Sequence, residues 1–384
     1  MPDLSVHVNG LRLPNPFVIA SGPPGTNASV IGRAFDEGWG GVVCKTVCLD
    51  ADSIINVSPR YAHLRATDSD EIVGWENIEL ISDRPFTTWL DEFRSLKDRY
   101  PDRPLIASVM EECRRDRWLE IIQRCDEAGV DGFELNLSCP HGLPERRMGQ
   151  AMGQNPDIVR QVCQWARHAT RKPVWAKMTP NITHIAEPAR AALQGGCDGL
   201  TAINTILCIM GVDLETLRPL PTVQGYSEAG GYSSKAIRPI ALRMVMECAR
   251  LAQAEFPDAT INAVGGVESG DDAVQFILLG AHTVQVCTGV MKFGYRMIGP
   301  MLDDLRAFMT RHNFKTVDEF RGRSLRYITT HADLVRRQAQ ARANRGAEGS
   351  ARDDRWEADR LVEQSRALFV EAPDEAVPKG LAHQ

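Results

Sequence analysis

The chain has 384 residues, of which 43% are hydrophobic and 24% charged. This composition is typical of a globular protein and excludes a disordered or fibrous one, and it supplies enough apolar residues for one large hydrophobic core. Its formal net charge of −6 and its pI near 5.9 argue against a nucleic-acid partner, because such proteins usually present a basic field. No apolar run approaches the ~20 residues of a membrane span, and Met1-Pro2-Asp3-Leu4 has no secretion signal, so we expect a cytoplasmic protein with no membrane contact.

The first predicted element is a β-hairpin near the N-terminus. Leu4–Leu13 contains an Asn-Gly pair, Asn9-Gly10, between two short runs in which apolar and polar residues alternate. Asn-Gly between such runs is the strongest local signal for a two-residue hairpin turn. We expect this hairpin to cover the N-terminal end of the domain that follows.

Beyond the hairpin, one pattern recurs: an amphipathic helix, a glycine, a short polar step and an apolar run. The glycine suits the end of a helix, and the apolar runs are typical of strands buried on both faces. Eight strands are predicted, near residues 16–21, 41–47, 104–109, 132–137, 173–178, 199–204, 260–265 and 283–287. Amphipathic helices between them include 116–128, 158–170 and 239–254. Eight alternating units predict an α/β fold, a (β/α)8 TIM barrel.

Three connections are unusually long or rich in loop residues, namely 48–84, 205–235 and 140–154. All three follow strands, so in a barrel they would cover the C-terminal mouth, where barrel enzymes do their chemistry. From about Arg321 onward, Arg, Asp, Glu, Ala and Gln dominate the sequence. We therefore predict a barrel domain over residues 1–320 and a charged, helical or flexible extension over 321–384, with a solvated surface.

Ten cysteines are scattered through the chain with no CxxC pair, so no zinc or iron–sulfur ligand spacing is present and no metal site is predicted. Cys139 stands out because it follows a predicted strand and therefore lies at the barrel mouth. By residue type alone, an inert buried thiol is the better interpretation. At that position a thiol can also serve as a general acid or base, if neighbours such as His141 and Arg146 tune it.

Asparagines mark several of the predicted mouth positions. Asn136 precedes Ser138 after the fourth strand, Asn204-Thr205 follows the sixth strand, and Asn77 lies in the 48–84 connection. An asparagine in a loop is often only a turn former. Three of them at the mouth favour a neutral heterocycle as substrate, because each side-chain amide offers both a donor and an acceptor.

Lys45 and Lys177 each end an apolar strand. A lysine there must reach an anion, a ring or water, since burying its charge unpaired is costly. Three interpretations remain open: a solvent-reaching end residue, a Schiff-base lysine of a barrel lyase or aldolase, or a cation beside a reduced flavin.

Glycines end the last two predicted strands, as Gly265-Gly266 and Thr288-Gly289. In barrels, this is the usual phosphate site, because glycines let backbone N–H groups approach an anion. The pairing favours a phosphorylated ligand without distinguishing FMN from a sugar phosphate.

At these positions the sequence resembles the FMN-binding domain of the dihydroorotate dehydrogenase superfamily, and most of all its dihydropyrimidine dehydrogenase branch. The resemblance covers about residues 4 to 335. The matching stretches are ASGPP (20–24), GWGGVVCKT (38–46), NVSPR (56–60), NIELIS (77–82), ELNLSCPHG (134–142), MGQNP (152–156), AKMTPNIT (176–183), INT (203–205), AIRPIALR (236–243), AVGG (263–266) and QVCTG (285–289). NIELIS and NLSCPHG together favour the dihydropyrimidine branch.

The resemblance implies a role for each matched residue. Cys139 would be the catalytic acid/base, on a mobile loop of residues 138–154. The pyrimidine would be surrounded by Asn77, Glu79, Ile81, Asn136, Leu137, Ser138, Asn204 and Thr205. FMN would be held by Ala20, Ser21, Gly22, Lys45, Thr46, Lys177, Ser234, Val264, Gly265, Gly266, Cys287 and Thr288. The implied reaction transfers a hydride between flavin N5 and C6 of uracil or thymine, while Cys139 handles the proton at C5.

The sequence departs from its relatives in two places. Ser234 stands where a glycine approaches FMN in relatives. The related bacterial subunit continues into a cysteine-rich tail with two iron–sulfur clusters, whereas this chain has no cysteine after Cys287. We therefore expect no iron–sulfur cluster in this chain, with NADH or NADPH acting only through a partner such as a flavoprotein electron-transfer subunit. The family also implies a possible homodimer.

Three alternatives stay open at this stage. One is another redox reaction of the same superfamily, such as dihydroorotate oxidation or reduction of a different ring. Another is the Schiff-base lyase that uses Lys177, and a third is a non-catalytic paralogue that only binds a ligand and a partner.

Overall fold

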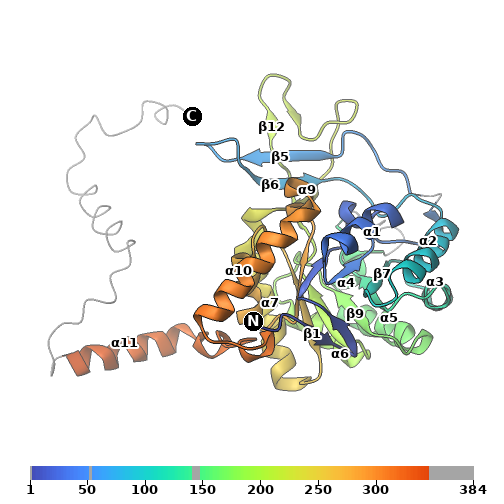
Figure 1. Ribbon diagram of the computed structural model, residues 1–384. Coiled ribbons are helices and arrows are strands. Elements are labelled where there is room, and N and C mark those ends of the chain that lie inside the picture. Colours follow the sequence, from blue (N-terminus) through green and yellow to red (C-terminus); the bar gives the residue numbers. More distant parts are fainter. Residues whose placement is uncertain (1, 52–53, 141–147, 346–384) are drawn as a thin grey trace. The chain divides into compact units, whose positions relative to one another are not determined.

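The computed structural model describes residues 2–51, 54–140 and 148–345. The chain divides into two compact units, residues 1–327 and 328–384. The first unit is built on a closed barrel of eight parallel strands (Figure 1). These strands are β3 (Phe17–Ile19), β4 (Gly41–Val43), β7 (Leu105–Val109), β8 (Gly132–Asn136), β9 (Val174–Lys177), β10 (Gly199–Ala202), β15 (Thr260–Val264) and β16 (Thr283–Val286). Each lies within one of the eight predicted segments, so the predicted (β/α)8 barrel is confirmed.

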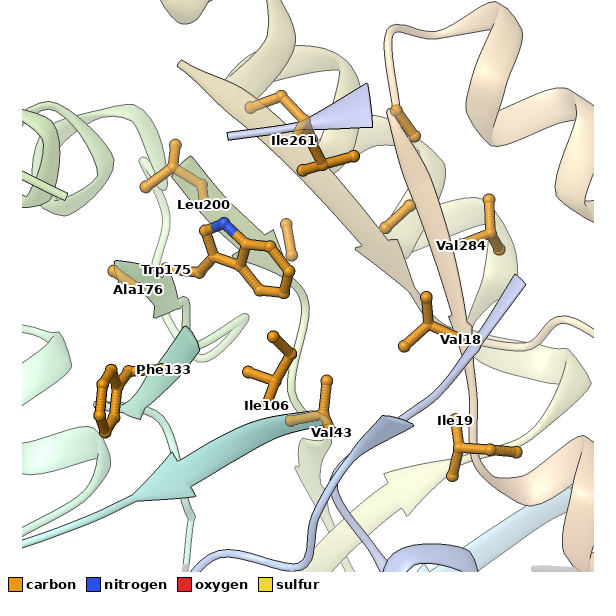
Figure 2. Close-up of a cluster of buried hydrophobic side chains, with 14 of the residues drawn as sticks. Val18, Ile19, Val43, Ile106, Phe133, Trp175, Ala176, Leu200, Ile261 and Val284 are labelled. Carbon is orange, nitrogen blue, oxygen red and sulfur yellow. The ribbon is translucent and has the colours of Figure 1, made fainter. Parts of the chain in front are cut away.

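The barrel closes because its last strand pairs with its first: Val284 of β16 is in register with Phe17 of β3. Around the barrel the order is β10-β15-β16-β3-β4-β7-β8-β9. Figure 2 shows the resulting core, in which all eight strands contribute apolar side chains, among them Val18, Val43 and Ile106. These side chains are almost fully buried, which is the main stabilising contribution to a fold of this kind.

Helices alternate with the strands and cover the barrel (Figure 1). The longer ones are α1 (Ala28–Glu37), α2 (Phe86–Arg99), α3 (Arg115–Glu127), α5 (Pro156–Ala169), α6 (Ala186–Gln194), α7 (Arg238–Glu255), α8 (Gly270–Leu278) and α10 (Ile298–Arg311). Short ones are α4 (Gln150–Gly153), α9 (Thr288–Phe293), η1 (Pro23–Gly25), η4 (Lys235–Ile237), η5 (Tyr295–Met297), η6 (Val317–Glu319) and η7 (Leu325–Tyr327). The three predicted helices correspond to α3, α5 and α7.

Helix α5 shows why these segments are helical. Its buried residues, Val159, Val162, Cys163 and Ala166, recur at the spacing that places side chains on one helix face. Asn155 caps its start by accepting a hydrogen bond from the backbone N–H of residue 158, at 3.2 Å. The helix therefore packs one apolar face against the barrel and leaves its charged face in water.

The predicted hairpin is present as β1 (Val6–Val8) and β2 (Leu11–Leu13). Asn9 and Gly10 both have positive φ, at 48° and 86°, as a type I′ turn requires. The Asn9 carboxamide oxygen accepts hydrogen bonds from Trp175 Nε1 at 2.8 Å and Thr260 Oγ1 at 2.6 Å. Thr260 begins β15, so the hairpin covers the N-terminal end of the barrel as predicted.

The long connections 48–84 and 205–235 build a second sheet at the opposite end. Four antiparallel strands, in the order β11-β14-β6-β5, form what we call the mouth sheet: β5 (Tyr61–Arg65), β6 (Ile72–Asn77), β11 (Ile206–Cys208) and β14 (Gly230–Ser233). A two-stranded hairpin, β12 (Val212–Asp213) and β13 (Arg218–Pro219), extends from it. In Figure 1 these strands lie beyond the carboxyl ends of the barrel strands. The sequence predicted the cover but not its sheet structure.

In the described part of the second unit, α11 (His331–Arg345) is a helix rich in arginine and alanine. The proposed division after residue 320 stays a prediction. Leu325, which lies beyond it, is 7% exposed and packs in the barrel unit. Of the helices in the described ranges, none has both the length and the apolar character that crossing a bilayer requires.

Candidate active site

A single cavity at the C-terminal mouth brings together most of the predicted site residues. It encloses about 1090 Å³ between its lining atoms, including the open solvent at its entrance. Of the 21 residues predicted to form the site, 19 line this cavity. The two exceptions are Leu137 and Ser138, which are fully buried beside it. The residues selected by the strand-end pattern therefore lie together at the C-terminal end of the barrel.

Hydrogen bonds connect the polar groups on the barrel side of the cavity. Asn136 Nδ2 donates to Thr46 Oγ1 at 2.9 Å, and the Ser138 hydroxyl donates to Asn136 Oδ1 at 3.1 Å. Asn204 Nδ2 donates to the Ser138 hydroxyl oxygen at 3.0 Å. Thr46 Oγ1 also lies 3.1 Å from the hydroxyl of Ser21. The two asparagine side chains are therefore held in fixed orientations by the serine between them, which explains the position of Ser138 behind the cavity wall.

The mouth sheet supplies the opposite wall. Asn77 ends β6 and donates from Nδ2 to the carbonyl of Gly231 on β14, at 3.0 Å. A Cβ atom on Gly231 would lie 2.2 Å from Thr205 Oγ1, so only glycine fits at this crossing. The pairing of β6 with β14 thus brings Asn77 and Thr205 to one place, although 128 positions separate them in the chain.

Lys45 and Glu79 form an ion pair across the two walls. Lys45 Nζ lies 2.7 Å from Glu79 Oε2, and Arg60 NH1 lies 3.2 Å from Glu79 Oε1. The Tyr61 hydroxyl donates to Glu79 Oε2 at 3.1 Å. Burial, together with the Glu79 charge, raises the pKa of Tyr61. The Glu79 carboxylate thus has three partners and a fixed place at the mouth.

Lys177 is held from inside the barrel instead. Its Nζ lies 3.3 Å from Glu134 Oε1, and both side chains are almost inaccessible to water. Gln285 Nε2 donates to the other carboxylate oxygen of Glu134 at 2.8 Å. Three strands separate β8 from β16 in either direction around the barrel, so this bond crosses the barrel interior. Glu134 therefore connects opposite walls of the barrel beneath the cavity.

Cys139 lines the cavity and is 7% exposed. It packs in a small apolar cluster with Cys48, Ile54, Ile81, Met110 and Met148. Of the predicted loop 138–154, residues 150–153 form α4, whereas residues 141–147, including His141 and Arg146, lie outside the described residues. The thiol is thus at the cavity wall, where a general acid would have to be.

The glycine-rich ends of β15 and β16 form another part of the wall. Gly266 has a φ of 72°, and a Cβ atom there would lie 2.8 Å from the carbonyl oxygen of Ser234. Ser234 itself has a φ of 78°, a conformation that favours glycine. Its hydroxyl donates to Glu268 Oε1 at 3.3 Å. Serine therefore replaces glycine while still lining the cavity.

Cys287 lines the cavity within electrostatic reach of both lysines. Burial raises the pKa of its thiol to about 11, while the positive charges of Lys177 and Lys45 act in the opposite direction. A Cβ atom on Gly22 would approach Cys287 Sγ to 2.5 Å. Gly22 and Cys287 are thus packed closely together on the cavity wall.

The sequence analysis missed several lining residues, among them Tyr61, Trp75, Ser233, Glu268 and Gln285. Gln285 carried a usable signal, because a polar residue inside an otherwise apolar strand of a barrel must find a partner in the interior. Trp75 and Tyr61 gave no such signal, because their strands belong to the unpredicted mouth sheet.

The comparisons with known proteins agree with this geometry. A family model described as dihydroorotate dehydrogenase matches residues 3–309. Over 374 residues the chain is 56% identical to "Dihydropyrimidine dehydrogenase (NADP(+)), chloroplastic" of Arabidopsis thaliana, covering 96% of this chain and 88% of that protein. It is 40% identical to "NAD-dependent dihydropyrimidine dehydrogenase subunit PreA" of Escherichia coli (strain K12), covering 87% and 80%.

Two more distant matches are also to dihydroorotate dehydrogenases. The chain is 32% identical to "Dihydroorotate dehydrogenase B (NAD(+)), catalytic subunit" of Pyrococcus abyssi, over 84% of this chain and 99% of that one. Among solved structures, a dihydroorotate dehydrogenase from Eimeria tenella in complex with ferulenol superposes with a TM-score of 0.70. That alignment has 22% identity and covers 84% of this chain and 89% of the other, and it supports the fold alone.

Proposed function

The chain belongs to the dihydroorotate dehydrogenase family, an oxidoreductase family, and from this premise we propose that it is an FMN-dependent enzyme interconverting uracil or thymine and the 5,6-dihydro form. One observation carries the proposal: the Cys139 thiol, the carboxamides of Asn77, Asn136 and Asn204, and two lysines line the same cavity. A proton donor, a set of groups suited to a cyclic amide and two cations are thus available at one place.

The cavity fits FMN in the chemistry of its walls. Lys45 and Lys177 offer positive charge, which an electron-rich flavin edge requires once reduced. The glycines at 265, 266 and 289, with Thr288 and Ser234, offer close backbone approach to a phosphate. Trp75 lines the cavity with a buried Nε1 that has no hydrogen-bond partner among the described residues, so a donor remains for a ligand. FMN, when bound, supplies the two-electron chemistry.

The chain's own residues would bind the pyrimidine and move the proton. A carboxamide both donates and accepts, so Asn77, Asn136 and Asn204 can match the alternating N–H and C=O groups of a uracil ring. The network through Ser138 fixes two of these amides before the substrate arrives, which lowers the entropic cost of binding. Cys139 would give its proton to C5 in reduction and take it back in the reverse direction, while C6 gains or loses a hydride.

Dihydroorotate is the second candidate substrate. Dihydroorotate carries a carboxylate, whereas uracil and thymine do not. The chain is 56% and 40% identical to relatives named dihydropyrimidine dehydrogenase, against 32% for one named dihydroorotate dehydrogenase, and this supports the neutral ring. The lyase alternative is less favoured because the Lys177 amine is held 3.3 Å from the buried carboxylate of Glu134, whereas a Schiff-base lysine must be free to attack a carbonyl.

Electron supply, assembly and compartment remain part of the proposal. We propose that NADH or NADPH acts through a flavoprotein partner. The printed names of two relatives, "subunit" and "catalytic subunit", support such an assembly. A homodimer and a cytoplasmic location also remain proposals, and the name of the plant relative, "chloroplastic", leaves the compartment open.

Purified protein tests the proposal directly. We expect a yellow protein that bleaches on anaerobic reduction and transfers the electrons to uracil or thymine faster than to orotate. Assays with NADPH and NADH, each with and without candidate flavoprotein partners, would identify the electron donor. A colourless protein that does not bind added FMN would refute the proposal, and a borohydride-trapped adduct at Lys177 would support the lyase instead.

A further inference from the structure

Glu134 carries a carboxylate that is buried inside the barrel, which is unusual for a charged side chain. The Glu134 side chain is 0% exposed. It lies on β8 two residues before Asn136, so the two side chains point to the same face of the strand. One of its oxygens accepts from Gln285, and the other, Oε1, has no hydrogen-bond partner among the described residues although Lys177 Nζ is 3.3 Å away. Burying such an ion pair seldom stabilises a fold, because the cost of removing two charges from water offsets their attraction.

Two other buried polar side chains follow Lys177 around the barrel. Thr201 and Asn262 lie on neighbouring strands in register with Lys177, and both are fully buried. Thr201 Oγ1 and Asn262 Nδ2 also lack hydrogen-bond partners within the described part of the chain. The Lys177 ammonium is the charged group that lies beside Oε1 within the described part of the chain, 3.3 Å away.

The second cavity lysine has a different arrangement. Lys45 pairs with Glu79 at 2.7 Å, and Glu79 is shared with Arg60 and Tyr61 at the mouth. Lys177 has the longer contact, to a carboxylate below the cavity floor, so its remaining N–H groups are available to a ligand above.

We propose that Glu134, braced by Gln285 across the barrel, is a positioning residue that holds the Lys177 ammonium against the cavity floor, where it meets the electron-rich edge of the bound flavin. This inference rests on the proposed function. It assigns to Glu134 an effect on the flavin that acts through Lys177 rather than directly. The brace is effective because Gln285 and Glu134 project from opposite walls of a closed sheet, whose register fixes both.

The reduction potential of the bound flavin tests this, because it responds to nearby charge and not to stability as such. Two independent charges would shift the potential additively, whereas a residue acting through another gives a non-additive cycle. The cycle uses the holoenzyme as wild type, Glu134→Gln, Lys177→Met and the double variant, each titrated anaerobically by absorbance.

Lys177→Met should lower the affinity for reduced relative to oxidised FMN by about tenfold. Glu134→Gln should also lower the affinity for reduced relative to oxidised FMN, because a neutral amide no longer attracts the Lys177 ammonium by charge and so holds it in place less firmly. In the Lys177→Met background, Glu134→Gln should instead raise the affinity for reduced relative to oxidised FMN, because there the substitution only removes a negative charge. The inference is supported if Glu134→Gln changes this relative affinity in opposite directions in the wild-type and Lys177→Met backgrounds. It is overturned if Glu134→Gln has the same effect in both.

Two further measurements keep the outcomes distinct. If Glu134→Gln does not fold, Glu134→Asp retracts the carboxylate and should lower the ratio less than Lys177→Met does; an unchanged ratio would overturn the inference. A wild-type chain that refuses FMN overturns the proposed function and this inference together, whereas FMN binding with an additive cycle overturns this inference alone.

Discussion

The two walls of the cavity are built differently. On the barrel side, Asn136, Lys177 and Asn204 stand at or just after the ends of strands, and the register of a closed sheet fixes their positions. On the mouth side, Asn77 and Glu79 come from a long connection, and their places depend on pairing with a second long connection, through β6 and β14. A rigid wall suits groups that take part in chemistry, whereas a wall of two loops suits groups that admit and select a ligand.

The two lysines express the same difference. Lys177 is paired with a carboxylate inside the barrel, and Lys45 with one that the mouth provides. We therefore expect changes on the barrel side to act on rate and on the flavin, and changes on the mouth side to act on substrate affinity.

The largest effect is expected at Cys139. Cys139→Ala should reduce turnover by about 100-fold or more while FMN stays bound, because the loss of a general acid has about this size. Steady-state assays with uracil, together with the flavin absorbance of the purified variant, measure both. Cys139→Ser, with a poorer acid of similar size, should also be slow. Turnover close to wild type in the alanine variant would show that the thiol only packs.

Lys177→Met should slow flavin reduction by roughly tenfold or more and weaken FMN retention, because a buried cation at a developing charge is lost. Stopped-flow absorbance and retained colour after gel filtration measure the two effects. Lys172→Met provides a matched control, since Lys172 is also ion-paired, with Asp126 at 2.6 Å, but does not line the cavity. If both variants behave alike, the effect of Lys177 is not specific to the site.

Glu79→Gln should raise KM for uracil by about fivefold to tenfold with a smaller change in kcat, because it frees Lys45, Arg60 and Tyr61 at the mouth. Initial rates over a range of uracil concentrations separate the two parameters. Glu71→Gln is the control, since Glu71 pairs with Lys235 near the same sheet without lining the cavity. A fall in kcat with unchanged KM would instead place Glu79 in the chemical step.

The smallest effect is expected away from the mouth, at His282. Burial lowers the pKa of His282 from 6.5 to about 3, and its Nδ1 accepts the backbone N–H of Ile261 at 3.1 Å. The unfolded chain binds this proton below pH 6.5 while the folded chain does not, so stability falls as pH drops from 6.5 toward 3. The slope is at most about 1.4 kcal/mol per pH unit.

Denaturant unfolding of wild type and His282→Gln at pH 7 and pH 5 isolates this contribution. The variant should lose less of its free energy of unfolding between the two values, and its turnover at pH 7 should be unchanged. An identical loss in both proteins would contradict the buried, neutral state of this imidazole.

Much of the barrel could be predicted from the sequence, because its strands are apolar runs that follow helix-ending glycines. Residues such as Asn136 and Lys177 could be placed at the mouth for the same reason, since parallel strands end on one side. Their individual roles came from the resemblance, not from these patterns. The mouth sheet was not predicted, because it forms only where β6 pairs with β14, more than a hundred residues further along the chain, and no local pattern links those two strands.

By itself, the sequence determined the strand count, the hairpin at Asn9-Gly10 and the end of the barrel where the polar residues gather, all of which depend on local periodicity and turn chemistry. Only the tertiary structure decided which carboxylate each lysine meets. That choice depends on closure of the barrel, which brings Gln285 to Glu134 across its interior, and on pairing of the two long connections, which brings Glu79 to Lys45. Such contacts join positions far apart in the chain, and no local pattern encodes the distance between them.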